Sequence, residues 1–243
     1  MHRLGCSTWC LMDMGLFEAL EILSERTDTI EILSDARHDL LYESESCASF
    51  NLSYTVHSPT TDINIASCRE TLRNASIDLL QEVCQKAGEI GARCVVVHPG
   101  FSPWLEMHDK SYDALRRSLV DLAVVQEEHG VPVAIENMGS WEVCHFRNPS
   151  VLPVLEEAGL SFCLDIGHAH INGVLDDFLA LATPDHIHLH DNRGSFDDHG
   201  ALGTGTMDLE HIIPRLPRNS CWIMEVKAID DFDESMRYME RRE

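Results

Sequence analysis

Basic residues are scarce in this chain. Lysine and arginine number 18 against 41 aspartates and glutamates, so the formal net charge is −23. A surface of this sign repels polyanions except where bound metal reverses it locally, and no extended basic track of the kind that grips duplex DNA is found. Acidity of this kind is typical of solvated helix faces that keep a protein soluble. The charge therefore disfavours extended duplex DNA as a partner.

Long apolar runs and paired cysteines are also missing. No apolar stretch approaches the roughly 18 residues that a membrane span requires. The first residues, MHRLGCSTWCLMDMGL, lack the basic start and unbroken apolar run of a signal peptide. The nine cysteines are odd in number and scattered without a CxxC pair, which is typical of reduced thiols. We therefore expect a cytoplasmic protein with no membrane partner, and the sequence leaves its oligomeric state open.

Strand-like and helical segments alternate along the whole chain, without a linker or a low-complexity tract. A length of 243 residues with 44% apolar residues suits one core. Short apolar or β-branched runs predict eight strands, at residues 4–9, 29–33, 52–57, 94–98, 131–136, 162–165, 186–190 and 222–226. Apolar residues at helical spacing precede Gly91 and Gly130, which are plausible helix ends. This arithmetic predicts an α/β fold, a (β/α)8 TIM barrel forming a single domain over residues 1–243, with an open doubly wound sheet as the alternative.

Side chains that can bind metal recur where the predicted strands end. Six stand at or near the carboxyl ends of strands: His57, His98, Glu136, Asp165, His188 and Glu225. Three more fall in the loops that follow: His168, Asp197 and His199. In a barrel these ends meet at one face, and buried histidines and carboxylates are costly unless they are paired or coordinated. The nine residues therefore predict a metal cluster and locate the active site of an enzyme.

Three histidines alternate along the predicted strand 186–190 and so share one side of it. His186 begins the strand, at the far end from the expected site, whereas His188 and His190 approach the site. We predict that His188 is the ligand and that His190, like His170, supports the ligands through contacts behind them. The alternative is that His188 and His190 exchange these roles.

The candidate residues stand in an ordered series of short motifs: HSPTTDINIAS, VVVHPG, IENM, LDIGHAH, HLHDN, DDHGALGTG and IMEVK. This series, from about residue 53 to residue 227, resembles the xylose-isomerase-like barrel family. That family includes endonuclease IV-type apurinic endonucleases as well as sugar or sugar-phosphate isomerases and epimerases. Each tripeptide alone is a weak signal, but the ordered series is specific. The resemblance implies the barrel counted above and two interpretations of the same residues.

The endonuclease IV pattern implies three zinc ions that share nine ligands. The first would bind His57, His98 and Glu136; the second would bind Glu136, Asp165, His188 and Glu225; the third would bind His168, Asp197 and His199. Such a cluster supplies hydroxide near neutral pH and holds both the attacking and the leaving oxygen of a phosphoester. Our first hypothesis is therefore a metal-dependent hydrolase with two or three zinc ions, or manganese or iron in their place, acting on a small phosphate ester or a damaged nucleic-acid end.

The isomerase and epimerase pattern implies one divalent ion. Its ligands would be Glu136, Asp165, His188 and Glu225. Glu136 and Glu225 would then act as the acid/base pair that moves a proton between adjacent sugar carbons, with His168 also in the catalytic set. His168 and Arg193 would hold substrate hydroxyls or a phosphate, and His190 is a further candidate for substrate binding. This interpretation leaves four of the nine candidates without a role: His57, His98, Asp197 and His199.

One departure from the endonuclease pattern concerns DNA. That group carries an inserting aromatic residue after its HxP motif, whereas Thr60 and Thr61 follow here. A threonine cannot fill the stack left by an extruded nucleotide, and we interpret Arg37 as a surface charge. We therefore expect a small phosphorylated or sugar substrate. Metal binding without catalysis is a third hypothesis, which the intact pair of Glu136 and Glu225 disfavours.

Overall fold

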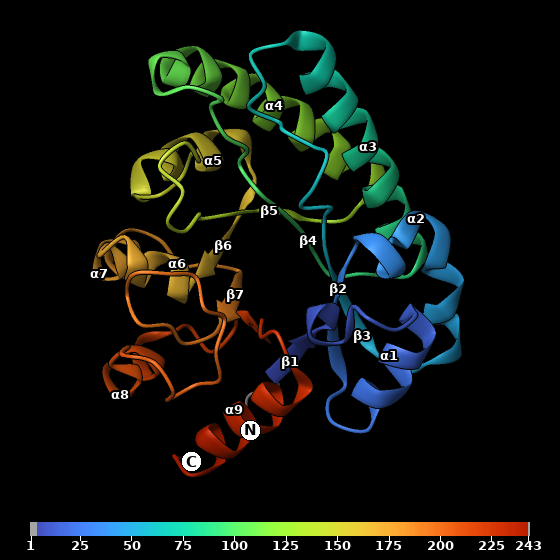
Figure 1. Ribbon diagram of the computed structural model, residues 1–243. Coiled ribbons are helices and arrows are strands. Elements are labelled where there is room, and N and C mark those ends of the chain that lie inside the picture. Colours follow the sequence, from blue (N-terminus) through green and yellow to red (C-terminus); the bar gives the residue numbers. More distant parts are fainter. Residues whose placement is uncertain (1–3, 243) are drawn as a thin grey trace.

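The computed structural model describes residues 4–242, and within them eight parallel strands close into a barrel (Figure 1). The strands are β1 (Leu4–Ser7), β2 (Thr29–Leu33), β3 (Ser53–His57), β4 (Val95–Val97), β5 (Val133–Glu136), β6 (Ser161–Asp165), β7 (His186–Leu189) and β8 (Cys221–Met224). Each strand pairs with its neighbours in the sequence, and β1 also pairs with β8. Because the sheet closes on itself, the predicted TIM barrel is confirmed and the open doubly wound sheet is excluded. The predicted domain ends, residues 1 and 243, lie outside the described part.

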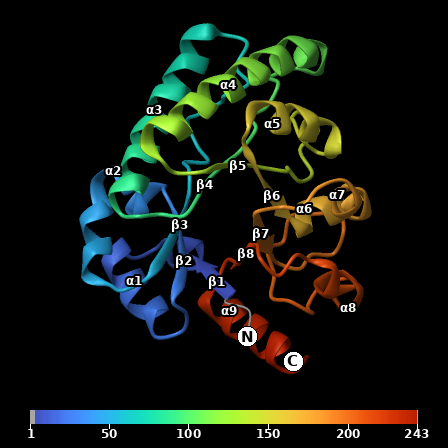
Figure 2. The ribbon, with the colours of Figure 1, turned by 180° about the vertical axis from the view of Figure 1, so that it is seen from behind.

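Helices form a ring around the strands in both views (Figures 1 and 2). The α-helices are α1 (Leu16–Ser24), α2 (Leu40–Glu43), α3 (Glu70–Glu89), α4 (His108–His129), α5 (Leu152–Ala158), α6 (Ile166–Ile171), α7 (Leu175–Leu181), α8 (Leu209–Ile212) and α9 (Ile229–Glu240). Short 3₁₀ helices are η1 (Thr8–Leu11), η2 (Ala36–His38), η3 (Ser44–Ser49), η4 (Leu105–Met107), η5 (Pro149–Val151) and η6 (Ile213–Arg215). Helix α9 lies beside β1, so the last helix completes the ring next to the first strand.

The two helices expected from apolar spacing are α3 and α4, which lie side by side (Figure 2). Their buried faces carry the predicted apolar residues, among them Leu80 and Val83 of α3 and Leu115 and Leu122 of α4. Helix α4 ends in front of Gly130, whose left-handed backbone (φ 66°) lets its N–H reach the carbonyl of Gln126. This is the glycine stop that the sequence indicated.

Several predicted strand boundaries were wrong by one or two residues. The first strand ends at Ser7, where the chain turns into η1 and the Ser7 hydroxyl accepts a hydrogen bond from the N–H of Trp9. Between β2 and β3 the helical segment is reduced to α2 with the short turns η2 and η3. No helix within residues 4–242 is long and apolar enough to cross a membrane.

The interior of the barrel is partly polar. Apolar side chains on the outer face of the strands, such as Ile30 and Ile187, belong to the large core beneath the helices. On the inner face, Glu31 of β2 reaches His186 and His188 of β7, although β2 and β7 are not neighbours in the sheet. A contact between such strands crosses the barrel, so these buried groups fill its interior below the carboxyl ends of the strands.

Candidate metal centre

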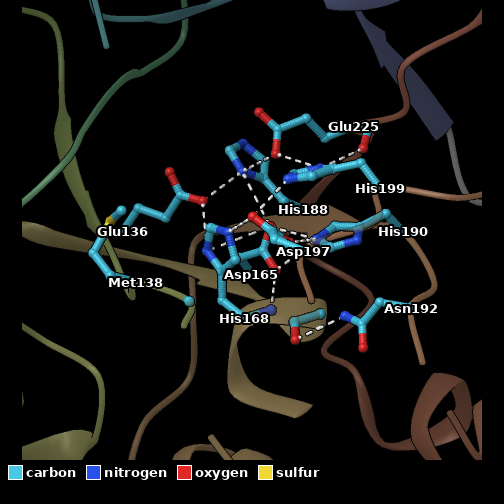
Figure 3. Close-up of polar contacts among 12 residues, drawn as sticks. Glu136, Met138, Asp165, His168, His188, His190, Asn192, Asp197, His199 and Glu225 are labelled. Carbon is cyan, nitrogen blue, oxygen red and sulfur yellow. Dashed lines mark hydrogen bonds and ion pairs between the residues drawn. The ribbon is translucent and has the colours of Figure 1, made fainter. Parts of the chain in front are cut away.

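The strand ends bring the predicted ligands to one face of the barrel. His57, Glu136 and Asp165 are the last residues of β3, β5 and β6. His188 lies within β7, while His98 and Glu225 directly follow β4 and β8. Since parallel strands in a barrel all point the same way, their carboxyl ends form a single rim. Figure 3 shows four of these side chains, those of Glu136, Asp165, His188 and Glu225, pointing toward one another.

The first group of possible ligands is formed by His57, His98 and Glu136, whose donor atoms lie within 4.8 Å of one another. The Nε2 atoms of the two histidines approach the same carboxylate oxygen, Glu136 Oε2, at 3.1 and 3.2 Å. Two imidazole nitrogens directed at one carboxylate oxygen form a donor set that suits zinc or another divalent transition metal.

The second group contains Glu136, Asp165, His188 and Glu225, and it shares Glu136 with the first. His188 Nδ1 lies 3.1 Å from Glu136 Oε1, 3.5 Å from Glu225 Oε2 and 3.9 Å from Asp165 Oδ2. All four residues are buried. Three buried carboxylates around one imidazole carry a net negative charge, and a divalent cation would offset it.

The third group is formed by His168, Asp197 and His199, with His190 beside them. Asp197 Oδ2 lies 2.9 Å from His168 Nε2 and 3.0 Å from His199 Nε2. Its other oxygen, Oδ1, is buried and has no hydrogen-bond partner among the described residues. Because a buried carboxylate oxygen without a partner is uncommon, a metal ion fits this group as well.

Main-chain carbonyls orient three of the histidines. The Nδ1 atoms of His57, His168 and His199 donate to the carbonyl oxygens of Ser58, Asn137 and Glu225 at 2.8, 2.8 and 2.9 Å. A carbonyl only accepts, so Nδ1 must carry the proton and Nε2 is the nitrogen free to bind metal. In all three residues Nε2 is also the atom that faces a carboxylate of its group.

The loop that carries Asp197 and His199 is held by Asp191, the residue after His190. Its carboxylate accepts hydrogen bonds from the N–H groups of Gly203 and Gly205, both at 3.0 Å. A Cβ atom on Gly205 would come within 2.2 Å of that carboxylate, so only glycine fits there. The loop also places His199 at φ 46°, a backbone conformation that non-glycine residues rarely adopt. The motif DDHGALGTG is thus a constrained loop rather than a flexible connection.

The charges of the site depend on one another. Burial by itself would lower the pKa of His57, but the hydrogen bond and charge of Glu136 raise it to about 9. Burial by itself would raise the pKa of Glu136. The charge of His188, together with the hydrogen bonds that Glu136 makes with His188 and His57, instead holds the pKa of Glu136 well below its usual range. Without metal the carboxylates therefore attract protons onto the histidines, and a bound cation would take the place of those protons.

A cavity of about 520 Å³ opens over the groups. Seven of the nine predicted ligands line it, whereas Asp165 and His188 do not. Its walls include Trp9, Phe101, Trp141 and Phe196, and among its lining residues Lys227 is the single lysine or arginine. The Lys227 Nζ donates to the carbonyl oxygen of Asp197 at 3.2 Å and lies 5.8 and 5.9 Å from the ring centres of Trp9 and Phe196. The cavity therefore has three carboxylates, from Glu136, Asp197 and Glu225, and one lysine near the third group.

Two of the residues predicted to contact substrate, Arg193 and His190, lie outside the cavity lining. Arg193 is exposed and is not among the residues that line the cavity. His190 is buried, with Nε2 at 3.0 Å from Asp165 Oδ1 and its ring stacked on His199 at 3.9 Å. His170 lies farther out, 3.5 Å from the hydroxyl of Thr206. The roles assigned to these residues stay predictions, but His190 contacts a predicted ligand directly.

The two threonines that replace an inserting aromatic residue line the cavity and bind the neighbouring loop. The hydroxyl groups of Thr60 and Thr61 donate to the carboxylate of Asp35 at 2.6 and 3.1 Å. Arg37 donates to the carbonyl oxygen of Asp13 at 2.7 Å and is exposed. The two threonines thus brace the loops after β2 and β3 against each other, and Arg37 joins the loop after β2 to the segment between η1 and α1.

Two polar residues of the site were missed in the sequence. Lys227 follows the motif residue Glu225 by two positions and is not among the predicted substrate contacts. Glu31, fully buried beside His188, is the single charge within the otherwise apolar run TIEIL. An isolated glutamate in a strand of this kind is the signal that could have identified it.

The fold and the donor groups together define a metal-binding (β/α)8 barrel. The chain belongs to the xylose isomerase-like TIM barrel family, whose model matches residues 13–242, and the resemblance inferred from the motifs is thereby confirmed. Proteins named as probable endonuclease 4 are similar to the chain in sequence, and proteins named as epimerases share its fold.

Three similar proteins illustrate this range. Uncharacterized protein MJ1614 of Methanocaldococcus jannaschii is 37% identical over 240 residues, 95% of each chain. A probable endonuclease 4 of Mycobacterium leprae is 31% identical over 172 residues, 65% of this chain and 66% of that relative. The crystal structure of a D-tagatose 3-epimerase-like protein superposes with a TM-score of 0.89 at 24% identity, covering 98% of this chain and 96% of the other.

Proposed function

We propose that this protein is a divalent-metal-dependent isomerase or epimerase of a small sugar or sugar phosphate. The observation that carries the proposal is that only two of the four ligands in the second group line the cavity. Glu136 and Glu225 line the cavity, whereas Asp165 and His188 do not. Two carboxylates thus face the substrate, which is the arrangement that proton transfer at a carbon requires.

Glu136, Asp165, His188 and Glu225 would hold the metal. When bound, a divalent ion polarises carbonyl and hydroxyl oxygens and so makes the neighbouring C–H bond more acidic. One carboxylate, Glu136 or Glu225, removes that proton, and the other returns a proton to the same carbon or to its neighbour. Return to the same carbon from the opposite face inverts it. Return to the neighbouring carbonyl carbon, together with transfer of the hydroxyl proton of the first carbon to the former carbonyl oxygen, completes an isomerisation.

The cavity supports a sugar over a nucleic-acid end, which reverses the order of the two hypotheses drawn from the motifs. Its volume of about 520 Å³ is in the range of small-ligand sites. Aromatic side chains such as Trp9 and Trp141 offer apolar faces on which a sugar ring can pack. Lys227 is placed to contact a phosphate, the role first assigned to Arg193. The epimerase-like structure also matches nearly the whole chain, whereas the endonuclease 4 match covers about two thirds of it.

Phosphoester hydrolysis is the second candidate, and one observation favours it. The third group, His168, Asp197 and His199, is complete, although a one-metal isomerase does not need it. A second or third zinc ion there would suit the hydrolase pattern. The chemistry of the donors favours zinc, with manganese or iron as alternatives.

Solvent exchange tests the proposal directly. Protein loaded with zinc or manganese is incubated in D₂O with a panel of aldoses, ketoses and their phosphates, and deuterium incorporation at carbon is followed by NMR. Phosphate release from the same esters and incision of an abasic oligonucleotide are measured in parallel. We expect exchange and a new sugar isomer, both abolished by Glu225→Gln. Phosphate release or incision without exchange at carbon would overturn the proposal and support the hydrolase.

A further inference from the structure

His188 is oriented differently from the other candidate ligands. His57, His168 and His199 direct Nε2 toward a carboxylate of their group, and their Nδ1 atoms donate to main-chain carbonyls. His188 instead directs Nδ1 toward Glu136 and Glu225. Its Nε2 atom points down into the barrel and lies 2.9 Å from Glu31 Oε1. What orients this imidazole is therefore a side chain, and a charged one.

Glu31 lies inside the barrel with no exposure to solvent. Its Oε2 atom accepts a hydrogen bond from the Thr55 hydroxyl at 3.0 Å and lies 2.8 Å from His186 Nε2. Neither its Oε1 atom nor His188 Nε2 has a hydrogen-bond partner among the described residues, so the 2.9 Å between them is a close ion-pair contact whose angles fall short of a hydrogen bond. The two atoms at 2.9 Å are thus the polar partners available to each other, and a buried carboxylate left unpaired would be costly.

A neutral imidazole carries one proton, and the position of that proton decides which nitrogen can bind metal. A carboxylate facing Nε2 keeps the proton there, which leaves the lone pair of Nδ1 directed at the second group. Carboxylates that contact the far nitrogen of a metal-binding histidine fix its orientation and raise its basicity.

We propose that Glu31 is a positioning residue for the second group: from within the barrel it selects Nδ1 of His188 as the ligand nitrogen. The proposal rests on the metal site put forward above but not on the reaction performed there. Glu31 is not among the residues that line the cavity, so its effect passes through His188. His186 shares the same carboxylate and closes the polar network on the side away from the site.

Glutamine is the informative replacement because it keeps the size and shape of Glu31. A carboxamide has one accepting oxygen and one donating nitrogen, whereas Glu31 offers an oxygen to each of two histidines. When the oxygen faces His186, the amide nitrogen faces His188 and reverses the position of its proton. Thr55→Val is the matched control, since it removes one hydrogen bond from Glu31 Oε2 within the same buried layer and leaves the Oε1 contact in place.

The measurement is zinc affinity, determined by competition with a chelator. The background is the double variant His98→Ala and His199→Asn, which removes one ligand from each of the other two groups. We expect Glu31→Gln to weaken zinc binding by about 10–100-fold, with Glu31→Asp between it and the unsubstituted background protein. Thr55→Val should change the affinity less than threefold. Nitrogen-15 NMR of the zinc-loaded protein should show the proton of His188 on Nε2.

A role in packing alone predicts a different result. Glu31→Gln would then lower the melting temperature while the zinc dissociation constant stays unchanged, and that outcome overturns the proposal. If Glu31→Gln does not fold, the NMR signal of the unsubstituted protein decides, because a proton on Nδ1 of zinc-loaded His188 contradicts the proposal. Cys163 is a third possible donor beside His186 and His188, since their donor atoms lie within 4.8 Å of one another. Loss of a zinc ion on Cys163→Ser, without an effect of Glu31→Gln, would assign His188 Nε2 to a metal bound within the barrel and would also overturn the proposal. None of these readouts uses catalytic activity, so they stand apart from the test of the isomerase.

Discussion

A pair of substitutions at Glu225 and His199 separates the two candidate chemistries. Glu225 faces the cavity and belongs to the second group, which both mechanisms use. His199 belongs to the third group, which the isomerase does not need. Glu225→Gln removes a base while keeping the shape of the side chain. The two variants therefore predict opposite patterns for an isomerase and for a hydrolase.

Asparagine is the replacement of choice at His199 for structural reasons. Its amide nitrogen takes the position of Nδ1 and can keep the hydrogen bond to the Glu225 carbonyl, which is 2.9 Å long. Asparagine also tolerates the left-handed backbone at φ 46° better than most residues. What it removes is Nε2, the atom 3.0 Å from Asp197 Oδ2. The loss of stacking on His190 should cost about 0.5–1.5 kcal/mol of folding stability, too little to unfold an ordinary domain.

The expected changes in kcat differ by orders of magnitude between the two variants. Loss of a positioned acid/base group costs about 10²–10⁴ in rate, or about 2.7–5.4 kcal/mol of barrier, so Glu225→Gln should lower kcat by that factor. His199→Asn should change kcat by less than about threefold in the isomerase. In a hydrolase that uses the third metal the same change should cost a hundredfold or more. The assay is deuterium exchange on the best substrate of the panel, with phosphate release measured beside it. A loss of a hundredfold in both variants would refute the isomerase proposal.

Three further predictions address metal content, substrate charge and pH. Because nine donor residues converge, zinc-reconstituted protein should retain two or three ions per chain by elemental analysis. His98→Ala should lose one ion while its circular dichroism spectrum stays unchanged. One ion in both proteins would rule out a cluster. Lys227→Met should raise KM for a sugar phosphate by about tenfold and leave a neutral sugar unaffected, whereas equal effects on both would show that Lys227 does not contact the phosphate. Burial, together with the charge of His108, lowers the pKa of His145 to about 4, below its ordinary value of 6.5. Between pH 4 and 6.5, His145 is therefore protonated in the unfolded chain but neutral in the folded protein. The contribution of neutral His145 to the free energy of unfolding is complete above pH 6.5 and is lost as the pH falls toward 4. Thermal melts of His145→Asn should depend less on pH in this interval, and an identical slope would contradict the reasoning.

Much of the fold is local in the sequence. Short runs rich in β-branched residues, such as TIEIL and VVV, form strands because β-branched side chains favour an extended backbone. The spacing of Leu80 and Val83 places both on one face of a helix. Eight strands that alternate with helices can close into a barrel, and in a closed barrel no strand edge of the sheet is exposed. The carboxyl ends of its strands then meet at one rim, so residues that end strands, such as His57 and Glu136, were predicted to converge from sequence position alone.

Contacts across the barrel depend on closure and register, which no local pattern encodes. Glu31 and His188 are far apart in the chain and on strands that do not pair, so their 2.9 Å contact exists only in the closed barrel. Loop geometry likewise decided that Lys227 rather than Arg193 lines the cavity, because a side chain's direction after a strand depends on the packing of several loops. By itself the sequence determined the barrel and which residues reach its rim. Only the tertiary structure decided which nitrogen of His188 faces the site and which side chains line the cavity, because both depend on neighbours supplied by distant strands and loops.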